Sequence, residues 1–481
     1  MTTQATAPSR DLDTATWEAA HTRLIDTLRD LIRIRSVNPP ASDAPDGELV
    51  AARHIAALLN DAGLDPDVVE PVPGRGSVHV RLHGDGSGGE PLLLLSHLDV
   101  VPAPAERWTH DPFAADLADG YVYGRGAVDM KGMVAMELGV VRLLADQARA
   151  AGLDPARNPI PGLRRDVLFT CTADEEAGGT DGAKWIVDHR PDWLRAAGAL
   201  NECGGVAMTV AGRRLYPIQV AEKGYAAYRI SVRGTWGHGS MPRHDNAAVL
   251  AAEVIARLAP AGPRRVTPVM ARFLELAASA LPPEAADILR GLASDDPATS
   301  EDAAAALTAA CDPMYARALS ALLRDTISPD VVHAGIKYNL IPGEAVVEVD
   351  CRILPGTTEP QMRAAIVERL GPTLADACEI ELFVFGPPVE APAEGDLFDL
   401  LVSTIIDHDP DAIPLPAMVP FATDAKQTQV LGVPTYGFSP LMLDPDERFL
   451  ERFHGVDERV SVDALRWGLP VLYDVVRRFC G

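Results

Sequence analysis

Short apolar runs that stop abruptly at a histidine or a carboxylate restrict the fold of this chain more than any other feature. The run 167–172 leads into Asp174-Glu175-Glu176, and the fully apolar run 92–95 leads into Ser96-His97. A continuous apolar run of this length predicts a strand in a parallel sheet that is covered on both faces. Open α/β sheets bind their ligands just beyond the carboxyl ends of such strands. The pattern therefore predicts an α/β fold with a polar site at one edge of its sheet.

Helical patterns alternate with these strands over the first part of the chain. Apolar spacing predicts helices at 15–35, 50–62, 133–149 and 182–189, and strands at 78–83, 92–95, 167–172 and 197–200. Alternation of this kind is typical of an α/β domain with a largely parallel sheet. The 481 residues exceed the length of one typical domain, so a second domain is expected.

The pattern changes after Lys223, where an inserted lid domain is predicted. Its expected parts are strands at 226–232, 334–337, 345–352 and 379–385 and helices at 247–258 and 361–370. This order predicts an antiparallel sheet with two helices on one face. The Ala-rich stretch 262–329 is predicted to be an extra helical insertion. The predicted boundaries are 11–224 and 389–481 for the two parts of a catalytic domain, and 225–388 for a lid or dimerisation domain.

Composition excludes some partners and suggests a compartment. The formal net charge of −25 argues against nucleic acid or an anionic membrane as a partner, although a small anionic substrate can still bind a local cationic site. Residues 1–10 are polar and lack the apolar core of a signal peptide, and no apolar run is long enough to cross a bilayer. The six scattered cysteines contain no Cys-x-x-Cys pair. We therefore expect a cytoplasmic protein without a membrane partner.

The residues at the strand ends and on glycine-rich loops are sufficient to hold a pair of divalent metal ions. We expect Asp129, in the loop Gly124-Arg-Gly-Ala-Val-Asp-Met-Lys-Gly132, to bridge two ions. Glu176 and His454 would complete one ion, and His97 and Glu202 the other. Two divalent cations carry +4 and the three carboxylates −3, so one hydroxide makes this buried site neutral. Because the ligands are nitrogen and oxygen, zinc, cobalt and manganese are plausible, and Cys203 beside Glu202 would favour zinc if it reached an ion.

Two further carboxylates have predicted roles that do not involve binding a metal. Asp99 lies two residues after His97, so both side chains leave the strand on one face, and Asp99 can accept a hydrogen bond from the far ring nitrogen of His97. Glu175 is the spare carboxylate beside Glu176, and we expect it to act as the general base. Asp174 competes with it for that role, but is interpreted as a capping or solvated residue.

The combined motifs resemble the M20 metallopeptidase group, which includes aminoacylases, glutamate carboxypeptidases, succinyl-diaminopimelate desuccinylases, acetylornithine deacetylases and dipeptidases. The resemblance extends from about residue 20 to the C-terminus and depends on Ser96-His-Leu-Asp-Val-Val-Pro102, Asp119-Gly-Tyr-Val-Tyr-Gly-Arg-Gly-Ala-Val-Asp129, Asp174-Glu-Glu-Ala-Gly-Gly179, Glu202 and His454. It implies two catalytic zinc ions with Asp129 as the bridge and Glu175 as the acid/base.

The resemblance also implies roles for residues of the lid. In such enzymes a lid histidine of the partner subunit stabilises the oxyanion, so His238 in Gly237-His-Gly-Ser240 is the candidate and a homodimer is expected. Asn339 and Arg352 resemble lid residues that hold the carboxylate or carbonyl of the substrate. Thr423 lies in Phe421-Ala-Thr-Asp-Ala-Lys426, where the family more often has Gly-x-Thr-Asp-Ala-Arg. The segment resembles one that lines the cleft.

The predicted function is hydrolysis of an amide bond in a small peptide or an N-acyl amino acid with a free carboxylate. A metal-bound hydroxide would attack the carbonyl, with Glu175 transferring the proton. Carboxypeptidase or dipeptidase cleavage and deacylation of an N-acyl amino acid both fit the ligand set. Two alternatives stay open, namely an N-carbamoyl-amino-acid amidohydrolase and a metal-stabilised binding protein without catalytic activity.

Overall fold

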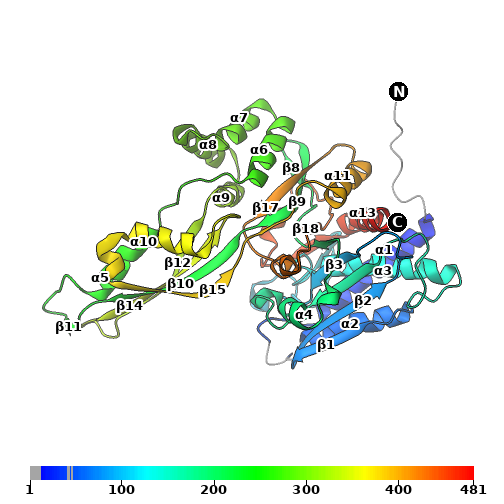
Figure 1. Cartoon of the computed structure of the whole chain (residues 1–481), viewed down its shortest axis with the longest axis horizontal. Helices are drawn as coiled ribbons and strands as arrows, with labels where there is room; N and C mark the ends of the chain where they lie inside the picture. Colours follow the sequence, from blue (N-terminus) through cyan, green and yellow to red (C-terminus); the bar gives the residue numbers. More distant parts are fainter. Residues whose placement is uncertain (1–11, 41–43, 45–46) are drawn as a thin grey trace. The chain divides into compact units, whose positions relative to one another are not determined.

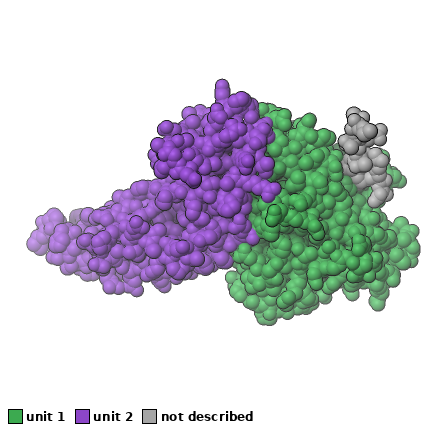
Figure 2. Space-filling model, turned by 45° about the horizontal axis from the view of Figure 1, so that its top comes forward, with its two compact units in different colours: residues 1–220, 391–417, 423–481 green, residues 221–390, 418–422 purple. Residues whose placement is uncertain are grey.

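The computed structural model describes residues 12–40, 44 and 47–481, so the predictions for the first ten residues lie outside the described part. The chain divides into two compact units, coloured green and purple in Figure 2. Unit 1 comprises residues 1–220, 391–417 and 423–481, and unit 2 comprises residues 221–390 and 418–422. Within the described ranges, none of the helices combines the length and the apolar character that crossing a bilayer requires.

Unit 1 is built on a mixed sheet whose centre is parallel (Figure 1). Its strands follow the order β1 (Asp67–Val72), β2 (Arg75–Leu82), β6 (Val167–Thr172), β3 (Leu92–His97), β7 (Gly198–Asn201), β18 (Thr435–Gly437) and β9 (Arg213–Glu222). The pairs β6–β3, β3–β7 and β7–β18 are parallel, and the outer pairs are antiparallel. Every residue of β3 and β6 is buried, which explains their continuous apolar runs. The predicted α/β class is confirmed.

Helices cover the sheet and bring the strand ends into one region. The helices of unit 1 are α1 (Thr14–Arg33), α2 (Gly47–Asp61), α3 (Lys131–Ala150), α4 (Ala183–His189), α11 (Asp396–His408), α12 (Ala425–Thr428) and α13 (Val462–Cys480). Helices α3 and α13 contact β3, and Ile186 of α4 packs with Leu93 and Leu168. His97 pairs in register with Thr172, so the segments that follow β3 and β6 begin side by side.

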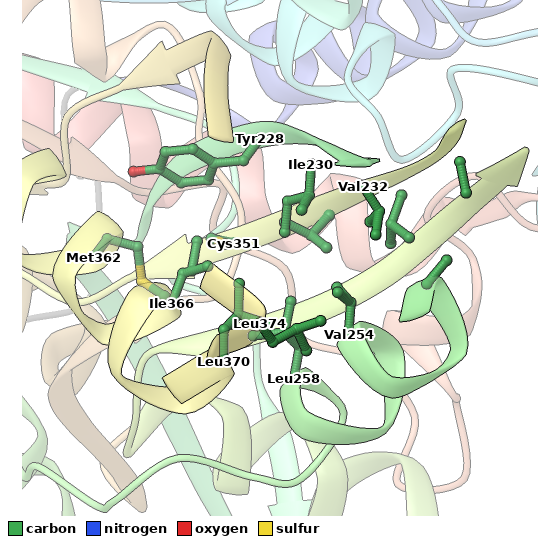
Figure 3. Packing of buried hydrophobic residues seen from close by; sticks show 14 of the residues in the cluster. Tyr228, Ile230, Val232, Val254, Leu258, Cys351, Met362, Ile366, Leu370 and Leu374 are labelled. Carbon is green, nitrogen blue, oxygen red and sulfur yellow. The ribbon is translucent and has the colours of Figure 1, made fainter. Parts of the chain in front are cut away.

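Unit 2 contains an antiparallel sheet with the order β12 (Thr326–Ala334), β14 (Glu344–Ile353), β10 (Gly224–Arg233) and β15 (Cys378–Gly386). Buried and half-buried residues alternate along β10, as predicted for a strand with one covered face. Figure 3 shows Ile230 and Val232 of this sheet packed against Val254 of α5 (Ala247–Leu258) and Ile366 of α10 (Glu359–Asp376). The predicted antiparallel sheet with two helices is thus present.

The extra insertion is helical, but it is shorter than predicted. It comprises α6 (Pro268–Ala280), α7 (Pro283–Leu292), α8 (Pro297–Ala310) and α9 (Pro313–Leu322), each of which starts with a proline. Residues 326–329, predicted to be insertion, belong to β12, and the strand predicted at 334–337 is wrong because β12 ends at Ala334. Pro329 prevented the prediction of this strand, because proline is uncommon within strands. It is tolerated because β12 is an edge strand whose register shifts between Pro329 and Val331.

Short strands complete both units. Those of unit 1 are β4 (Leu117–Ala118), β5 (Tyr121–Tyr123), β8 (Met208–Val210) and β19 (Arg459–Ser461), while β17 (Ala412–Val419) begins in unit 1. Those of unit 2 are β11 (Gly237–His238), β13 (Leu340–Ile341) and β16 (Val389–Glu390). Strands β11 and β13 form a two-stranded antiparallel ladder with His238 opposite Leu340. We refer to β11, β13 and their flanking residues 236–241 and 336–341 as the β11–β13 ladder.

Candidate active site

Five predicted metal ligands come together in unit 1. We refer to them as the carboxylate–histidine cluster, which consists of His97, Asp129, Glu176, Glu202 and His454. The two oxygens of Asp129 face different imidazoles, with Oδ1 at 3.1 Å from Nε2 of His97 and Oδ2 at 3.2 Å from Nε2 of His454. Glu176 Oε2 lies 3.1 Å from the His454 ring, and Glu202 Oε1 lies 3.7 Å from the His97 ring. Asp129 therefore lies between two groups of ligands.

The local backbone presents these side chains from the ends of buried strands and from tight turns. His97 ends β3, Glu202 follows β7, and Glu176 lies in a single 3₁₀ turn shortly after β6. Asp174, Cys203 and His454 have φ values of 66°, 70° and 55°. Left-handed backbone is uncommon for residues other than glycine and is often found at functional sites. All three positions lie in the cluster or within two residues of one of its members.

Asp99 connects His97 to the segment that carries Glu175 and Glu176. Nδ1 of His97 lies 3.0 Å from the main-chain carbonyl of Asp99 and 3.4 Å from its carboxylate. Because a carbonyl can only accept, Nδ1 carries a proton, and in the neutral ring Nε2 is left as the acceptor that faces the cluster. The Asp99 carboxylate accepts from the backbone amides of Glu175 and Glu176 at 3.1 and 3.0 Å. Asp99 thus orients His97 mainly through its main-chain carbonyl, and the segment of Glu175 and Glu176 through its side chain.

The electrostatics of the cluster favour the binding of cations. Burial raises the pKa of Glu176 to about 7 and holds that of Glu202 well above its usual value. Hydrogen bonds to Asp129 and Glu176 raise the pKa of His454 to about 10. Burial alone would lower the pKa of His97, but hydrogen bonds to Asp129 and Asp99 raise it well above its usual value. In the metal-free protein, protons bound to these groups therefore provide the positive charge that the carboxylates of the cluster attract.

The donor set fits divalent metal ions. Candidate ligand atoms of His97, Asp129 and Glu176 lie within 4.8 Å of one another, and so do those of His97, Glu175 and Glu202. Oε1 of Glu176 is buried and has no hydrogen-bond partner among the described residues. A buried carboxylate oxygen without a donor is costly unless a cation or a water satisfies it. Carboxylate oxygens and imidazole nitrogens are ligands that zinc, cobalt and manganese accept.

A buried ion pair that the sequence analysis missed supports the loop of Asp129. Glu458 accepts hydrogen bonds from the backbone amides of Val128 and Asp129 at 2.7 and 3.1 Å, and from Arg125 at 2.6 Å. Arg125 also donates to the carbonyl oxygen of His454 at 3.3 Å. The pair therefore ties the loop of Asp129 to the loop of His454. Arg125 lies in the loop of Asp129 and Glu458 lies shortly after His454, so a search for charged residues beside the ligands could have found them.

A second buried network lies behind Asp99. Asn38 donates to Asp99 at 2.8 Å and to Asp174 at 3.2 Å, and Arg75 donates to Asn38 at 2.8 Å and to Glu48 at 2.6 Å. Asp174 is only 5% exposed, so its interpretation as a solvated residue is wrong. Its side chain accepts from the amide of Asp181 at 3.0 Å but makes no capping hydrogen bond to the 3₁₀ turn 175–177.

Glu175 and the segment 423–426 lie in contact within unit 1. Oε1 of Glu175 lies 3.2 Å from Nζ of Lys426. Thr423, which was predicted to contact the substrate, is only 1% exposed, and its hydroxyl accepts from Asn201 at 3.0 Å and from the amide of Ala425 at 3.1 Å. In this structure Thr423 orders the segment that carries Lys426. Cys203 contacts the carboxylate of Glu202 at 3.2 Å.

The predicted residues of unit 2 lie in more open surroundings. His238 is exposed, and its Nδ1 accepts the backbone N–H of Ser240 at 3.2 Å. In the neutral ring the proton must therefore be on Nε2, which makes this nitrogen a donor. The carbonyl of Asn339 accepts from Gly239 across the β11–β13 ladder at 2.9 Å. Arg352 on β14 pairs with Asp350 at 2.9 Å, so its side chain forms an ion pair within its own strand.

Comparison with known proteins assigns the chain to a family and identifies solved structures with the same fold. A sequence model of Peptidase family M20/M25/M40 matches residues 93–478, which include all five members of the cluster. The chain is 27% identical to "Probable carboxypeptidase S-like 2" of Dictyostelium discoideum over 81% of this chain and 71% of that protein. It is 26% identical to "N-fatty-acyl-amino acid synthase/hydrolase PM20D1" of Homo sapiens over 82% of this chain and 75% of that protein. The M20 family metallo-carboxypeptidase Sso-CP2 from Sulfolobus solfataricus has the same fold, with a TM-score of 0.70 at 17% identity over 95% of this chain and 99% of that one.

Proposed function

The chain belongs to peptidase family M20/M25/M40, and from this membership we propose that it hydrolyses the amide bond of an N-acyl amino acid whose carboxylate is free, using two divalent metal ions, preferably zinc. The placement of Asp129 carries the proposal, because each of its oxygens faces a different histidine. Glu176 and Glu202 lie on the two sides of this arrangement, and the spare carboxylate of Glu175 lies beside them.

The substrate class follows from what two relatives have in common. A carboxypeptidase releases the last amino acid of a peptide, and an N-fatty-acyl-amino acid hydrolase releases an amino acid from a fatty acyl group. In both substrates an acyl carbon is joined to the nitrogen of an amino acid with a free carboxylate. We therefore define the substrate by this shared scaffold, with a peptidyl, acetyl or longer acyl group on the nitrogen.

Glu175 performs the proton transfers in the proposed reaction. Two cations held by the cluster would polarise the scissile carbonyl and lower the pKa of an attacking water. The carboxylate of Glu175 takes one proton from that water as its oxygen bonds to the carbonyl carbon. It then gives this proton to the amide nitrogen as the carbon–nitrogen bond breaks. The products are a carboxylic acid and an amino acid.

His238 stabilises the developing oxyanion from the partner subunit of a proposed homodimer. The backbone hydrogen bond to its Nδ1 supports this role, because it leaves Nε2–H as a donor before any substrate arrives. We assign the substrate carboxylate to Asn339 and Arg352, with Arg352 exchanging Asp350 for the substrate. Thr423 contributes by ordering the segment that carries Lys426.

A hydrolysis screen on the zinc-loaded protein tests this function. The panel contains N-acetyl and N-palmitoyl amino acids, dipeptides, N-carbamoyl amino acids, and the carboxamide form of each substrate as a matched control. We expect turnover of N-acyl amino acids or dipeptides and a loss of at least about tenfold with the carboxamides. In Glu175→Gln we expect a small residual rate, reduced by about 10²- to 10⁴-fold.

Two outcomes contradict the proposal. Turnover of N-carbamoyl substrates alone, with release of ammonia and carbon dioxide, would identify the N-carbamoyl-amino-acid amidohydrolase. Binding of two metal ions and of acyl amino acids without any turnover would identify a metal-stabilised binding protein. Wild-type rates in Glu175→Gln would contradict the role of this residue in either case.

A further inference from the structure

Lys426 is buried and has no assigned role in the proposed reaction. It belongs to the short helix α12, and its side chain is only 6% exposed. Its Nζ lies 3.2 Å from Oε1 of Glu175, whose side chain is 10% exposed, and donates to the carbonyl of Thr423 at 3.0 Å. The two side chains are 251 positions apart in the chain. Contact between them therefore depends on the folded unit.

The contact leaves one carboxylate oxygen of Glu175 for chemistry. The backbone amide of Glu175 is held by Asp99 at 3.1 Å, and Oε1 is held by Lys426. A glutamate side chain has several rotatable bonds, and fixing both of its ends selects one arrangement from many. An ammonium group makes a compact contact with a single oxygen, whereas the planar fork of an arginine favours both oxygens of a carboxylate. A lysine at this position thus leaves Oε2 of Glu175 available.

We infer that Lys426 is a positioning residue that holds Glu175 by Oε1 and presents Oε2 to the reacting water. The inference rests on the proposed function, because it assigns a purpose to the orientation of the general base. The segment 423–426 is built for this purpose in unit 1. The hydroxyl of Thr423 binds the amide of Ala425, and Asn201 binds that hydroxyl, which anchors the turn before Lys426.

Substitution of Lys426 tests this role through kcat rather than through binding. Lys426→Met keeps the length of the side chain and removes its charge. We expect kcat to fall by roughly 10- to 100-fold, since misplacement of a catalytic group by about 1 Å has effects of this size. KM and the number of bound metal ions should stay unchanged. Lys426→Arg should recover only part of the loss, because it restores the charge but its planar fork also competes for Oε2 of Glu175.

A double-mutant cycle separates this inference from the proposed function. If Lys426 acts through Glu175, Lys426→Met should change the residual rate of Glu175→Gln by less than about twofold. An equal loss in both backgrounds would overturn the inference while the effect of Glu175→Gln alone upheld the function. Wild-type kcat in Glu175→Gln would overturn both. Lys184→Met is the matched control, because Lys184 pairs with Asp188 on an exposed helix face and should leave kcat unchanged.

A crystal structure of metal-loaded Lys426→Met gives a readout that does not depend on turnover. We expect the side chain of Glu175 to adopt another rotamer or several rotamers, with the five cluster residues in place. A single unchanged rotamer of Glu175 would overturn the inference even if kcat fell. Should Lys426→Met fail to fold, Lys426→Gln provides the same test with a neutral polar side chain.

Discussion

The carboxylate–histidine cluster of unit 1 and the β11–β13 ladder of unit 2 orient their polar side chains in opposite ways. Most cluster residues are held by partners far away in the chain, as when Glu458 binds the amide of Asp129 across 329 positions. His97 adds one local bond, from its Nδ1 to the carbonyl of Asp99. In the ladder, His238 takes its orientation from Ser240, two residues away. The cluster carboxylates are mostly buried, whereas His238 is exposed.

This difference separates two ways of preparing a side chain for catalysis. In the cluster, the fold brings together charges that repel one another and are costly to bury, so the surrounding network must support them. A local turn is sufficient for His238, because one backbone N–H selects its tautomer. Damage to the cluster should therefore affect metal binding and folding together. Damage to the ladder should affect substrate binding or the chemical step without affecting metal binding or folding.

Substitution of Asp129 should have the largest effect. It tests whether damage to the cluster affects metal binding. Asp129→Asn keeps the shape of the side chain but removes the charge that faces both histidines. We expect loss of bound metal and a fall in kcat of at least about 10³-fold, because even partners outside the ligand set cost 10–100-fold. Metal analysis and hydrolysis rates check this result. Glu379→Gln, which alters an exposed pair with Arg233, is the control, and two tightly bound ions in Asp129→Asn would contradict the assigned bridge.

Substitution of the ladder histidine should give a smaller and purely kinetic effect. His238→Ala removes one donor to the oxyanion, which is worth about 10²–10³ in kcat. Metal content and the unfolding midpoint should match those of the parent, as should those of the control His333→Ala on the exposed part of β12. Mixing His238→Ala with Glu175→Gln, both of which have low activity alone, should restore part of the activity in hybrid dimers. No recovery in verified hybrids would contradict a donor from the partner subunit.

The same comparison explains which parts of the site could be predicted from the sequence. The proximity of the cluster residues could be predicted because each follows an apolar run or lies on a glycine-rich loop, and their role as metal ligands stays a prediction. Glu48, Arg75 and Lys426 were missed because their contacts join segments that only the tertiary structure brings together. The role of His238 was predicted through a family resemblance alone and stays a prediction, since nothing in an exposed Gly-His-Gly segment indicates catalysis.

The fold was predictable where the hydrophobic pattern was strong. The buried runs of β3 and β6 and the amphipathic helix α5 follow their expected ranges closely. Strand β12 was missed because it carries Pro329 and Asp330 and lies at a sheet edge, where burial imposes little alternation. Pairing with β14, which only the folded unit reveals, makes this segment a strand.

Replacement of Glu458 tests whether its pair with Arg125 holds Asp129 in the position that metal binding requires. Glu458→Gln still accepts a backbone N–H but leaves the buried guanidinium of Arg125 without its counter-charge. Breaking a buried pair costs roughly 3–5 kcal/mol of stability, and loss of a supporting partner weakens metal affinity about 10–100-fold. Urea unfolding and chelator competition measure the two effects. Unchanged metal affinity would show that the loop of Asp129 keeps its geometry without this support.

The pH dependence of metal affinity should be the smallest of the expected effects. It also distinguishes the cluster from the ladder. The pKa of His454 is raised to about 10 in the metal-free protein, above the usual 6.5, by hydrogen bonds to Asp129 and Glu176. Its proton therefore stabilises the metal-free fold fully below pH 6.5, and this contribution disappears as the pH rises through about 10. A metal ion must displace that proton, so apparent affinity should rise about tenfold per pH unit for each proton released.

Metal titrations between pH 6.5 and 8.5 measure this slope, and the two regions should respond differently to substitution. His454→Asn removes the titrating ring, so its slope should be shallower by one proton although its affinity is weaker at every pH. His238→Ala leaves the cluster intact and should keep the parental slope. An unchanged slope in His454→Asn would assign the released proton to His97, Glu176 or Glu202, the other cluster groups whose pKa is raised in the metal-free protein. A flattened slope in His238→Ala would mean that the ladder contributes to metal binding, which its local hydrogen bonds alone do not explain.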